Sequence, residues 1–371
     1  MTTPDLPLPR AGFIVPPELF IRHTADRGFI GPALTRLRDG SLLMAAPWGR
    51  PPVDFRQLKD PLPTPMIYRS SDHGRTWSEA GRFAMAWSLD GIPSDGGITF
   101  LRLQDGRIAA LFNHNRAHGG GMPALTFSGD EGRTWTPAHQ LLPHDDVFYV
   151  MNDRLIQLRT GRLVVPVSHK IGQWEGDLDE NLCVLSDDAG ASWRLSRGHL
   201  RLNHPRGLAE PCVVELADGR LLLLARTGAG SHHAAYSADG GETWTAPQPT
   251  TLTAACSPLT LHRLPDGRLI VFYNHATPLA DGAFFPRNPL VHAVSADAGA
   301  TWSPPVVIDD EGVAGLNGET RQHIYPGACF LPEGILLVYS THRANLDGSF
   351  TQPEGAWQIG GGKRCEIKYP G

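Results

Sequence analysis

Polar side chains that can transfer protons or bind anions recur at fixed distances from six Gly-centred turns. Three of the six segments carry a polar residue nine positions before the turn glycine, and five carry a basic residue seven or eight positions after it. Both sets stand about one strand length from the turn, so we expect them to ring one central pocket at the opposite end of the fold. The alternative is that they merely cap strands at a solvated surface. The residues are Asn152, Glu210 and Tyr325 before the glycine, and His114, His169, Arg226, His275 and His342 after it.

The turns themselves predict β-hairpins. In each, a glycine precedes an apolar run, as in RDGSLLMAA at 38–46 and ADGRLLLLA at 217–225. Asp-Gly between apolar runs is a strong hairpin signal because glycine readily adopts the positive φ that the turn needs. Six such turns predict six antiparallel sheets. The turn glycines are Gly40, Gly106, Gly161, Gly219, Gly267 and Gly334.

A second repeat, Ser-x-Asp-x-Gly-x-(Thr/Ser)-Trp, occurs five times, at 70–77, 128–135, 186–193, 237–244 and 295–302. Its aspartate can accept hydrogen bonds from backbone N–H groups of a tight turn, and its glycine can supply a positive φ. We therefore interpret the aspartates of these Asp boxes as turn formers rather than catalytic acids. They are Asp72, Asp130, Asp188, Asp239 and Asp297.

The two repeats together predict an all-β protein, a six-bladed β-propeller of four-stranded antiparallel blades, in one domain over residues 1–371. The 41 glycines and 32 prolines suit many tight turns between short strands. The sixth blade has no Asp box. We expect the N-terminal strand to join the C-terminal segment there, which closes the ring and removes open sheet edges.

Composition excludes several classes of partner. The net charge is −5 with both signs interspersed and without a basic stripe, so we expect no nucleic acid partner. No run approaches 18 apolar residues, so we expect no membrane span. We also expect no metal and no cofactor, because no paired metal-ligand spacing occurs among the histidines and the five cysteines are widely spaced. The N-terminus resembles no secretory signal, which favours a cytoplasmic location, although a secreted chain that has lost its leader would look the same.

Asp boxes in a six-bladed pattern resemble the sialidase (exo-neuraminidase) superfamily over nearly the whole chain. Three segments carry the resemblance best: AEPCVVELADGRLLLLAR at 209–226, FFPRNPLVHAVSADAGATW at 284–302 and HIYPGACFLPEG at 323–334. The resemblance implies a tyrosine nucleophile, a glutamate that deprotonates it, an aspartate acid and arginines that bind the substrate carboxylate. The corresponding residues are Tyr325, Glu210, Asp54 (with Asp60 as second choice), Arg226 and Arg287.

These residue types suit a sialoside, whose anomeric carbon carries a carboxylate. That carboxylate would repel an anionic nucleophile, whereas a tyrosine that is deprotonated only as it attacks avoids the repulsion. Arginine binds the carboxylate through a permanently charged, bidentate fork. The insert at 169–181, which carries Trp174, is a plausible rim loop for the rest of the glycan.

The chain departs from the family at the start of the first blade. Sialidases carry Phe/Tyr-Arg-Ile-Pro there, and its arginine is the first of three that bind the carboxylate. Here the stretch reads Phe-Ile-Gly-Pro, with Ile30 in the arginine position. Another arginine could replace it, or a protonated histidine, in which case binding should weaken above about pH 6.5. The candidates are Arg22, Arg27, Arg321 and Arg343 among the arginines, and Gln322-His323, His275 and His342 in the polar lining.

The sequence therefore predicts an exo-acting glycoside hydrolase that takes a glycan and releases terminal sialic acid or a related 2-keto sugar acid. The absent arginine and the histidines leave open a hydrolase or lyase acting on a uronate or rhamnosyl-uronate. A non-catalytic glycan-binding propeller is the third hypothesis. The sequence does not determine the oligomeric state.

Overall fold

Each Gly-centred turn joins two antiparallel strands, as the sequence predicts. In the fourth repeat, β16 (Ala209–Glu215) and β17 (Leu221–Arg226) pair around Gly219, whose φ is 91°. The computed structural model describes residues 8–21, 31–46, 65–82, 92–93, 97–115, 121–143, 146–171, 178–204, 206–276, 286–312, 319–345 and 361–371. Within these ranges the chain forms strands and no helix, so no helix there could cross a membrane.

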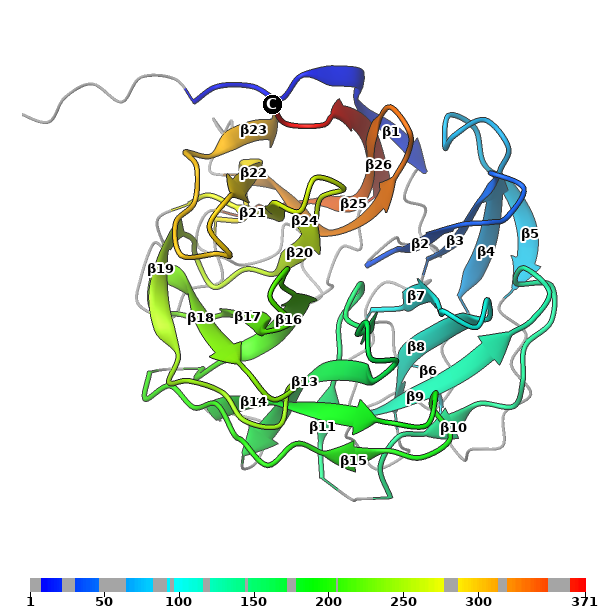
Figure 1. Cartoon of the computed structure of the whole chain (residues 1–371). Coiled ribbons are helices and arrows are strands. Elements are labelled where there is room, and N and C mark those ends of the chain that lie inside the picture. The colour runs from blue at the N-terminus through cyan, green and yellow to red at the C-terminus, as the bar shows by residue number, and fades with distance from the viewer. Residues whose placement is uncertain are drawn as a thin grey trace, which may run out of the picture.

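The strands form six antiparallel sheets around a common centre, with β2, β7, β16, β20 and β24 nearest to it (Figure 1). Four sheets have four strands, and the second and third have a short fifth strand, β6 (Ile92–Pro93) and β11 (Phe148–Tyr149). The architecture is the predicted six-bladed β-propeller.

The remaining strands fall into blades in chain order. Blade one contains β2 (Ala33–Arg36), β3 (Leu42–Ala46), β4 (Met66–Ser70) and β5 (Ser78–Arg82); blade two contains β7 (Thr99–Arg102), β8 (Ile108–Asn115), β9 (Gly121–Ser128) and β10 (His139–Gln140). Blade three contains β12 (Ile156–Gln157), β13 (Leu163–Ile171), β14 (Leu178–Ser186) and β15 (Arg194–Leu195); blade four contains β16, β17, β18 (Ser231–Ser237) and β19 (Gln248–Thr253). Blade five contains β20 (Leu259–Arg263), β21 (Leu269–Asn274), β22 (Leu290–Ser295) and β23 (Val306–Asp309); blade six contains β24 (Glu319–Phe330), β25 (Gly334–Asn345), β26 (Gly361–Lys368) and β1 (Phe13–Ile21).

Blade six closes the ring by joining the two ends of the chain. Strand β1 pairs antiparallel with β26, from Phe13 opposite Ile367 to Ile21 opposite Gly362. Figure 1 shows the blue β1 beside the red β26. The predicted closure is confirmed.

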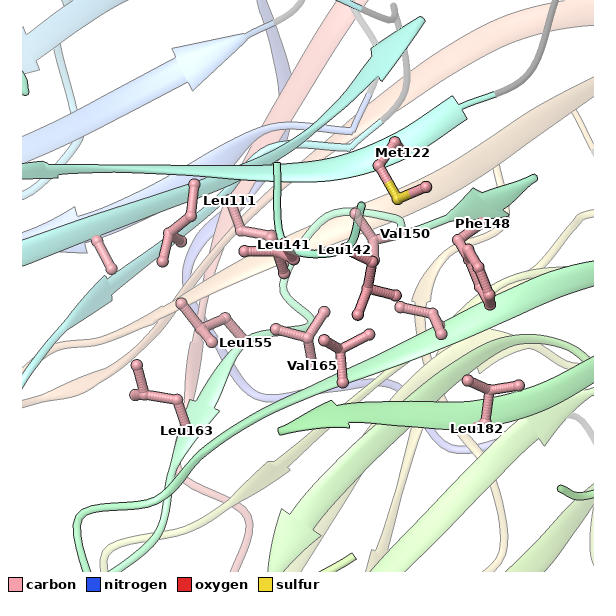
Figure 2. Packing of buried hydrophobic residues seen from close by; sticks show 14 of the residues in the cluster. Leu111, Met122, Leu141, Leu142, Phe148, Val150, Leu155, Leu163, Val165 and Leu182 are labelled. Carbon is pink, nitrogen blue, oxygen red and sulfur yellow. The ribbon is translucent and has the colours of Figure 1, made fainter. Parts of the chain in front are cut away.

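The hydrophobic core is divided among the spaces between neighbouring blades. Six of the clusters of buried residues each combine side chains of two adjacent blades. Figure 2 shows the cluster between blades two and three, where Leu111 and Met122 of one blade face Val165 and Leu182 of the next. Burial at about 25 cal/mol per Å² of apolar surface makes these faces the main stabilising term of the fold. Each blade is therefore held by its neighbours.

The Asp boxes form tight turns, as predicted. In the first box, Thr76 N and Thr76 Oγ1 donate to the Asp72 carboxylate at 2.8 and 2.6 Å, and Ser70 Oγ donates to it at 2.8 Å. Gly74 has a φ of 85°, and a Cβ there would lie 2.5 Å from Leu336 Cδ2 of blade six. The box thus requires glycine both for its backbone and for close packing on the neighbouring blade.

Candidate active site

Strand β16 carries a β-bulge at Glu210, the position that the repeat register singles out. The pairing with β17 shifts between Ala209 and Cys212, so Glu210 and Pro211 face a single residue. Glu210 has a φ of 46°, a left-handed conformation that costs a non-glycine residue about 1–3 kcal/mol. Pro211 has no N–H, so it leaves no backbone donor unpaired in the bulge. Bulges re-aim side chains, and this one turns Glu210 toward Tyr325.

Strand β24 repeats the same device at Tyr325. The pairing with β25 shifts between Ile324 and Gly327, and Tyr325 has a φ of 52° ahead of Pro326. In the same repeat position of blade one, Gly31 has a φ of 51°. The repeat backbone therefore takes the left-handed conformation at this position in several blades. In blades four and six the residues there are Glu210 and Tyr325, whose side chains can exchange a proton.

The two bulges bring a phenol, a carboxylate and a guanidinium together. Tyr325 Oη donates to Glu210 Oε1 at 3.1 Å, and Arg226 Nη1 lies 2.8 Å from the same oxygen. All three residues are at most 8% exposed. Glu210 Oε2 is buried and has no hydrogen-bond partner among the described residues, so one carboxylate oxygen stays open to accept a proton.

Burial and charge set the protonation states of this group. Burial alone would raise the pKa of Glu210, but the guanidinium groups of Arg226, Arg287 and Arg154 outweigh it and hold the pKa below its usual value. Burial and the neighbouring Glu210 carboxylate raise the pKa of Tyr325 to about 12. At neutral pH a protonated phenol therefore faces an ionised carboxylate.

Arg287 is a second buried arginine beside this group. It is 3% exposed, and Gln322 Oε1 accepts a hydrogen bond from its backbone N–H at 2.6 Å. Burial and then the positive charge of Arg226 lower its pKa, which places the two guanidinium groups within electrostatic reach of each other. Like charges held together in a buried site favour an anion between them.

Comparison with known proteins agrees with this architecture. A family model for the BNR repeat-like domain matches residues 118–370, more than half of the chain. The chain belongs to the BNR repeat-like domain family. A sialidase of Micromonospora viridifaciens is 28% identical over 246 residues, which make up 57% of this chain and 35% of that protein. The chain thus spans about a third of that relative's length.

Solved structures share the fold. A Dyadobacter fermentans protein of unknown function superposes with a TM-score of 0.72 at 18% identity, over 98% of this chain and 100% of the other. A Hadza microbial sialidase superposes with a TM-score of 0.67 at 19% identity, over 94% of this chain and 67% of the other. At these identities the likeness shows the propeller fold alone.

A second tyrosine–carboxylate pair lies beside the first in this BNR repeat-like propeller. Tyr149 Oη donates to Asp179 Oδ2 at 2.8 Å, and Lys170 Nζ lies 3.3 Å from Asp179 Oδ1. Tyr149 packs against the apolar cluster that includes Tyr325. Burial raises the pKa of Asp179, and the charge of Glu210 adds to that rise. The sequence marked the insert at 169–181 as a rim loop, but no pattern singled out Tyr149 or Asp179.

Two more residues near the BNR propeller's centre were also missed. Arg226 Nε donates to Cys256 Sγ at 3.2 Å, whereas the sequence showed only five widely spaced cysteines. Arg206 has a φ of 74°. Its pKa is lowered by burial, raised by Cys256 and lowered again by the positive charge of Arg226, so the two guanidinium groups lie within electrostatic reach of each other. Nothing in the spacing of the repeats marks either position.

Asn152 lies at the axis of the BNR propeller, where its side-chain amide donates to backbone oxygens of Pro32, Tyr325 and Pro326 at 3.4, 3.2 and 3.1 Å. It is 1% exposed. Its predicted role in binding substrate stays a prediction, and the contacts that the structure gives it are with the backbone.

The predicted histidines form two groups: His323 and His342 lie close to Arg287, and His114, His169 and His275 form the other group. His169 Nδ1 lies 2.8 Å from Glu180 Oε1, and its ring stacks on Phe148 at 4.6 Å. Burial lowers the pKa of His275. His114 lies in β8, and its side chain is outside the described part of the chain. Their roles in substrate binding stay predictions.

His323 and His342 are buried close to Arg287. Burial lowers the pKa of His323 to about 4, and burial together with the charge of Arg287 lowers the pKa of His342 to about 3. Both are neutral at physiological pH. Buried surroundings disfavour the charged ring. The pKa shifts therefore count against a protonated histidine in place of the missing arginine, and that role stays a prediction.

Several predicted residues lie outside the described part of the chain: Asp54, Asp60, Ile30, Arg22, Arg27 and the side chain of Arg343. Arg321 is described, and its Nε lies 3.3 Å from Glu311 Oε1. Asp54 as the acid therefore stays a prediction. In the described residues, no group of three or more histidine, cysteine, aspartate or glutamate side chains could hold a metal ion.

Proposed function

We propose that this BNR repeat-like propeller is an exo-acting glycoside hydrolase that releases a terminal 2-keto sugar acid, such as sialic acid, from a glycan. The observation that carries the proposal is the hydrogen bond from Tyr325 Oη to Glu210 Oε1, with Arg226 on the same oxygen. The similarity to the Micromonospora viridifaciens sialidase supports the same class of substrate.

The first step would be attack by Tyr325 Oη on the anomeric carbon. Glu210 accepts the phenolic proton as the new C–O bond forms, so the phenolate never builds up at its own pKa of about 12. The bond to the leaving group breaks, and its oxygen takes a proton from an acid, for which Asp54 is our candidate. The product of this step is a glycosyl-tyrosine ether and a protonated Glu210.

The second step would reverse these transfers with water in place of the leaving group. The acid, now ionised, takes a proton from the water as its oxygen attacks the anomeric carbon. The bond to Tyr325 breaks, and Glu210 returns the proton to the phenolate. Two displacements at one carbon retain the anomeric configuration.

Arg226 and Arg287 would bind the substrate carboxylate. Both are buried, and the positive charge of Arg226 lowers the pKa of Arg287, so an anion between them would offset their repulsion. The same pair would hold the sugar in line with Tyr325, because Arg226 also contacts Glu210. Arg226 would thus couple binding of the substrate to the position of Glu210, the base that accepts the proton of Tyr325.

The second candidate is a hydrolase or lyase for a uronate or rhamnosyl-uronate. Ile30 in the position of the family's first arginine favours it, because a different carboxylate placement would need a different clamp. A uronate would still use Arg226 and Arg287. The two candidates therefore differ in the sugar and not in the anion-binding residues.

The experiment is an assay of the purified protein against aryl glycosides of sialic acid, other ulosonic acids, uronic acids and rhamnose, with a Tyr325→Phe protein as control. Mass analysis identifies the released sugar, and early NMR spectra give its anomeric configuration. Release of a 2-keto acid with retention supports the proposal. Release of an unsaturated or plain uronate supports the second candidate, and calorimetric binding without turnover supports a glycan-binding propeller.

A further inference from the structure

The segment Asn152–Arg154 of blade three lies at the axis of the propeller, between β11 and β12, and its three side chains reach other blades. The Asn152 amide donates to backbone oxygens in blades one and six. Asp153 Oδ2 lies 2.8 Å from His262 Nε2 of blade five. One short turn thus connects the inner strands across the ring.

Arg154 reaches the other side of the axis. Its Nη2 donates to the backbone oxygens of Glu210 at 3.4 Å and Leu259 at 2.9 Å, and its Nη1 donates to the oxygen of Asn152 at 2.8 Å. The guanidinium therefore joins blades four and five to the turn itself. Arg154 is 1% exposed.

Two of these acceptors belong to the strained residues of the site. The Asn152 amide holds the carbonyl of Tyr325, and Arg154 holds the carbonyl of Glu210. Both carbonyls lie in β-bulges, where the regular pairing between neighbouring strands is interrupted. Hydrogen bonds from blade three therefore hold the backbone at Tyr325 and Glu210, where the pairing between neighbouring strands is irregular.

The close approach of the turn depends on blade two. A Cβ on Gly97 would lie 2.4 Å from the backbone nitrogen of Asn152, and Gly97 has a φ of 64°. Only glycine allows the two backbones to meet there without a shift. The Asn152 turn thus contacts blade two in addition to blades one, four, five and six.

The charge of Arg154 is unusual for a structural contact. Within the described residues, the hydrogen bonds of its guanidinium all go to backbone carbonyl oxygens, and none goes to a carboxylate. A buried charge is costly without an ionised partner, so an apolar side chain would fill a purely structural position at lower cost. The charge instead acts on Glu210, whose ionised form it favours.

We propose that Asn152 and Arg154 are positioning residues, which set the distance between Tyr325 and Glu210 by holding the backbone carbonyls of both from one turn. The inference rests on the proposed function, in which this pair is the nucleophile and its base. Because both donors come from one turn, a shift of that turn moves the two residues together, and removal of one donor moves them apart.

The test compares Arg154→Met, Arg154→Lys and Asn152→Ala with the wild type, and uses Arg159→Met, on the partly exposed rim of the same blade, as the matched control. We expect kcat of Arg154→Met and Asn152→Ala to fall about 10- to 100-fold with little change in KM, because a displacement of about 1 Å has that effect on rate. Arg159→Met should match the wild type.

The pH profile separates positioning from folding. The charged and titratable groups around Glu210 are Arg154, Arg226, Arg287, Tyr149, Asp179, Cys212 and Tyr325. Loss of the Arg154 charge removes one group that favours the ionised form, so the acid limb of kcat/KM should move to higher pH in Arg154→Met. It should stay in place in Arg154→Lys, which keeps the charge, and in Asn152→Ala.

Crystal structures and NMR give readouts without turnover. We expect a changed φ at Glu210 and a longer Tyr325 Oη–Glu210 Oε1 distance in Arg154→Met, and the titration of the ¹³C-labelled Glu210 carboxyl should move upward. If Arg154→Met does not fold, Arg154→Lys carries the test, with lower kcat, an unchanged acid limb and a changed φ at Glu210; a lower kcat with an unchanged φ at Glu210 would overturn the proposal. A wild type that cleaves no glycoside would refute the proposed function. The crystal structures and the NMR titration would still test the positioning.

The proposal is overturned if folded Arg154→Met matches the wild type in kcat and acid limb. It is equally overturned if kcat falls while the acid limb, the φ of Glu210 and its titration all stay unchanged, because the effect would then be merely structural.

Discussion

Tyr325 Oη lies 3.1 Å from Glu210 Oε1, although 115 positions of the sequence separate the two residues. They stand at the same repeat position of blades six and four, each followed by a proline within a β-bulge. The internal symmetry of the propeller therefore brings them together, since equivalent positions of all blades meet at the axis.

Removal of the Tyr325 hydroxyl should abolish most activity. We expect kcat of Tyr325→Phe to fall roughly 10²–10⁴-fold or more, because both the nucleophile and its proton transfer to Glu210 are lost. Steady-state kinetics on the best substrate of the panel measures the effect. Tyr236→Phe is the control, because it also loses one hydroxyl hydrogen bond, to Ala298 O at 3.1 Å, away from the site. Equal rates in the two variants would contradict the proposed nucleophile.

Replacement of either buried arginine by lysine should weaken binding of an acidic substrate. A lysine keeps the charge but cannot form the bidentate fork, so we expect KM of Arg226→Lys and Arg287→Lys to rise about 10- to 100-fold. Arg226→Lys should also lower kcat, since Arg226 contacts Glu210 at 2.8 Å. Arg159→Lys serves as the control. Unchanged KM in both variants would rule out the carboxylate-binding role.

Titration of the buried histidines should not change KM between about pH 5 and pH 8. Burial lowers the pKa of His323 to about 4 and that of His342 to about 3, so both stay neutral across this window. A substrate carboxylate is ionised throughout it and adds no dependence. The measurement is KM against pH for the wild type and His323→Gln. A rise in KM above pH 6.5 that the substitution removes would show that the histidine is charged after all.

Loss of a box aspartate should lower stability and leave the chemistry intact. Asp72→Ala removes the acceptor of Ser70 Oγ, Thr76 N and Thr76 Oγ1, and we expect the free energy of unfolding to fall by about 1–3 kcal/mol. Glu333→Ala, at an exposed hairpin turn, should melt like the wild type. Calorimetry and activity per folded molecule test this. A variant with wild-type stability and no activity would contradict the structural role.

The contribution of the boxes should depend on pH in one direction. Side-chain and backbone donors of Thr134 hold the pKa of Asp130 at about 2, below the unfolded value of 3.8. A lowered folded pKa means that the stabilisation is complete above about pH 4 and is lost as pH falls through about 2. The difference in Tm between wild type and Asp130→Asn should therefore be constant above pH 4 and shrink below it. A constant difference down to pH 2 would contradict this account.

The fold could be predicted because the propeller repeats its turn chemistry. The Gly-centred turn recurs in all six blades and the Asp box in five, and both are local signals, so one misinterpreted segment does not change the architecture. The closure by β1 and β26 followed from the missing box in blade six. The short fifth strands, β6 and β11, carry no such signal and were not predicted.

The candidate site could be predicted only in part. The repeat register identified Glu210, Tyr325 and Arg226, because the fold superimposes equivalent positions at the axis. It did not indicate the left-handed backbone at Glu210 and Tyr325, since sequence signals for a positive φ come from glycine and asparagine. Arg154 was missed because arginine is usually exposed, and only the structure shows which carbonyl oxygens surround it.

The pairing of β1 with β26 has a consequence for how the protein is made. Residues 13–21 and 361–368 lie far apart in the sequence, so β1 leaves the ribosome well before β26 and has to wait for it before the two strands can pair. At about 5–20 residues per second that wait is on the order of half a minute. Five blades that packed before that pairing would form an open arc, whose end faces would expose the apolar side chains that blade six covers in the folded protein. Exposed apolar surface favours aggregation, so the pairing of β1 with β26 would end the aggregation-prone stage of folding.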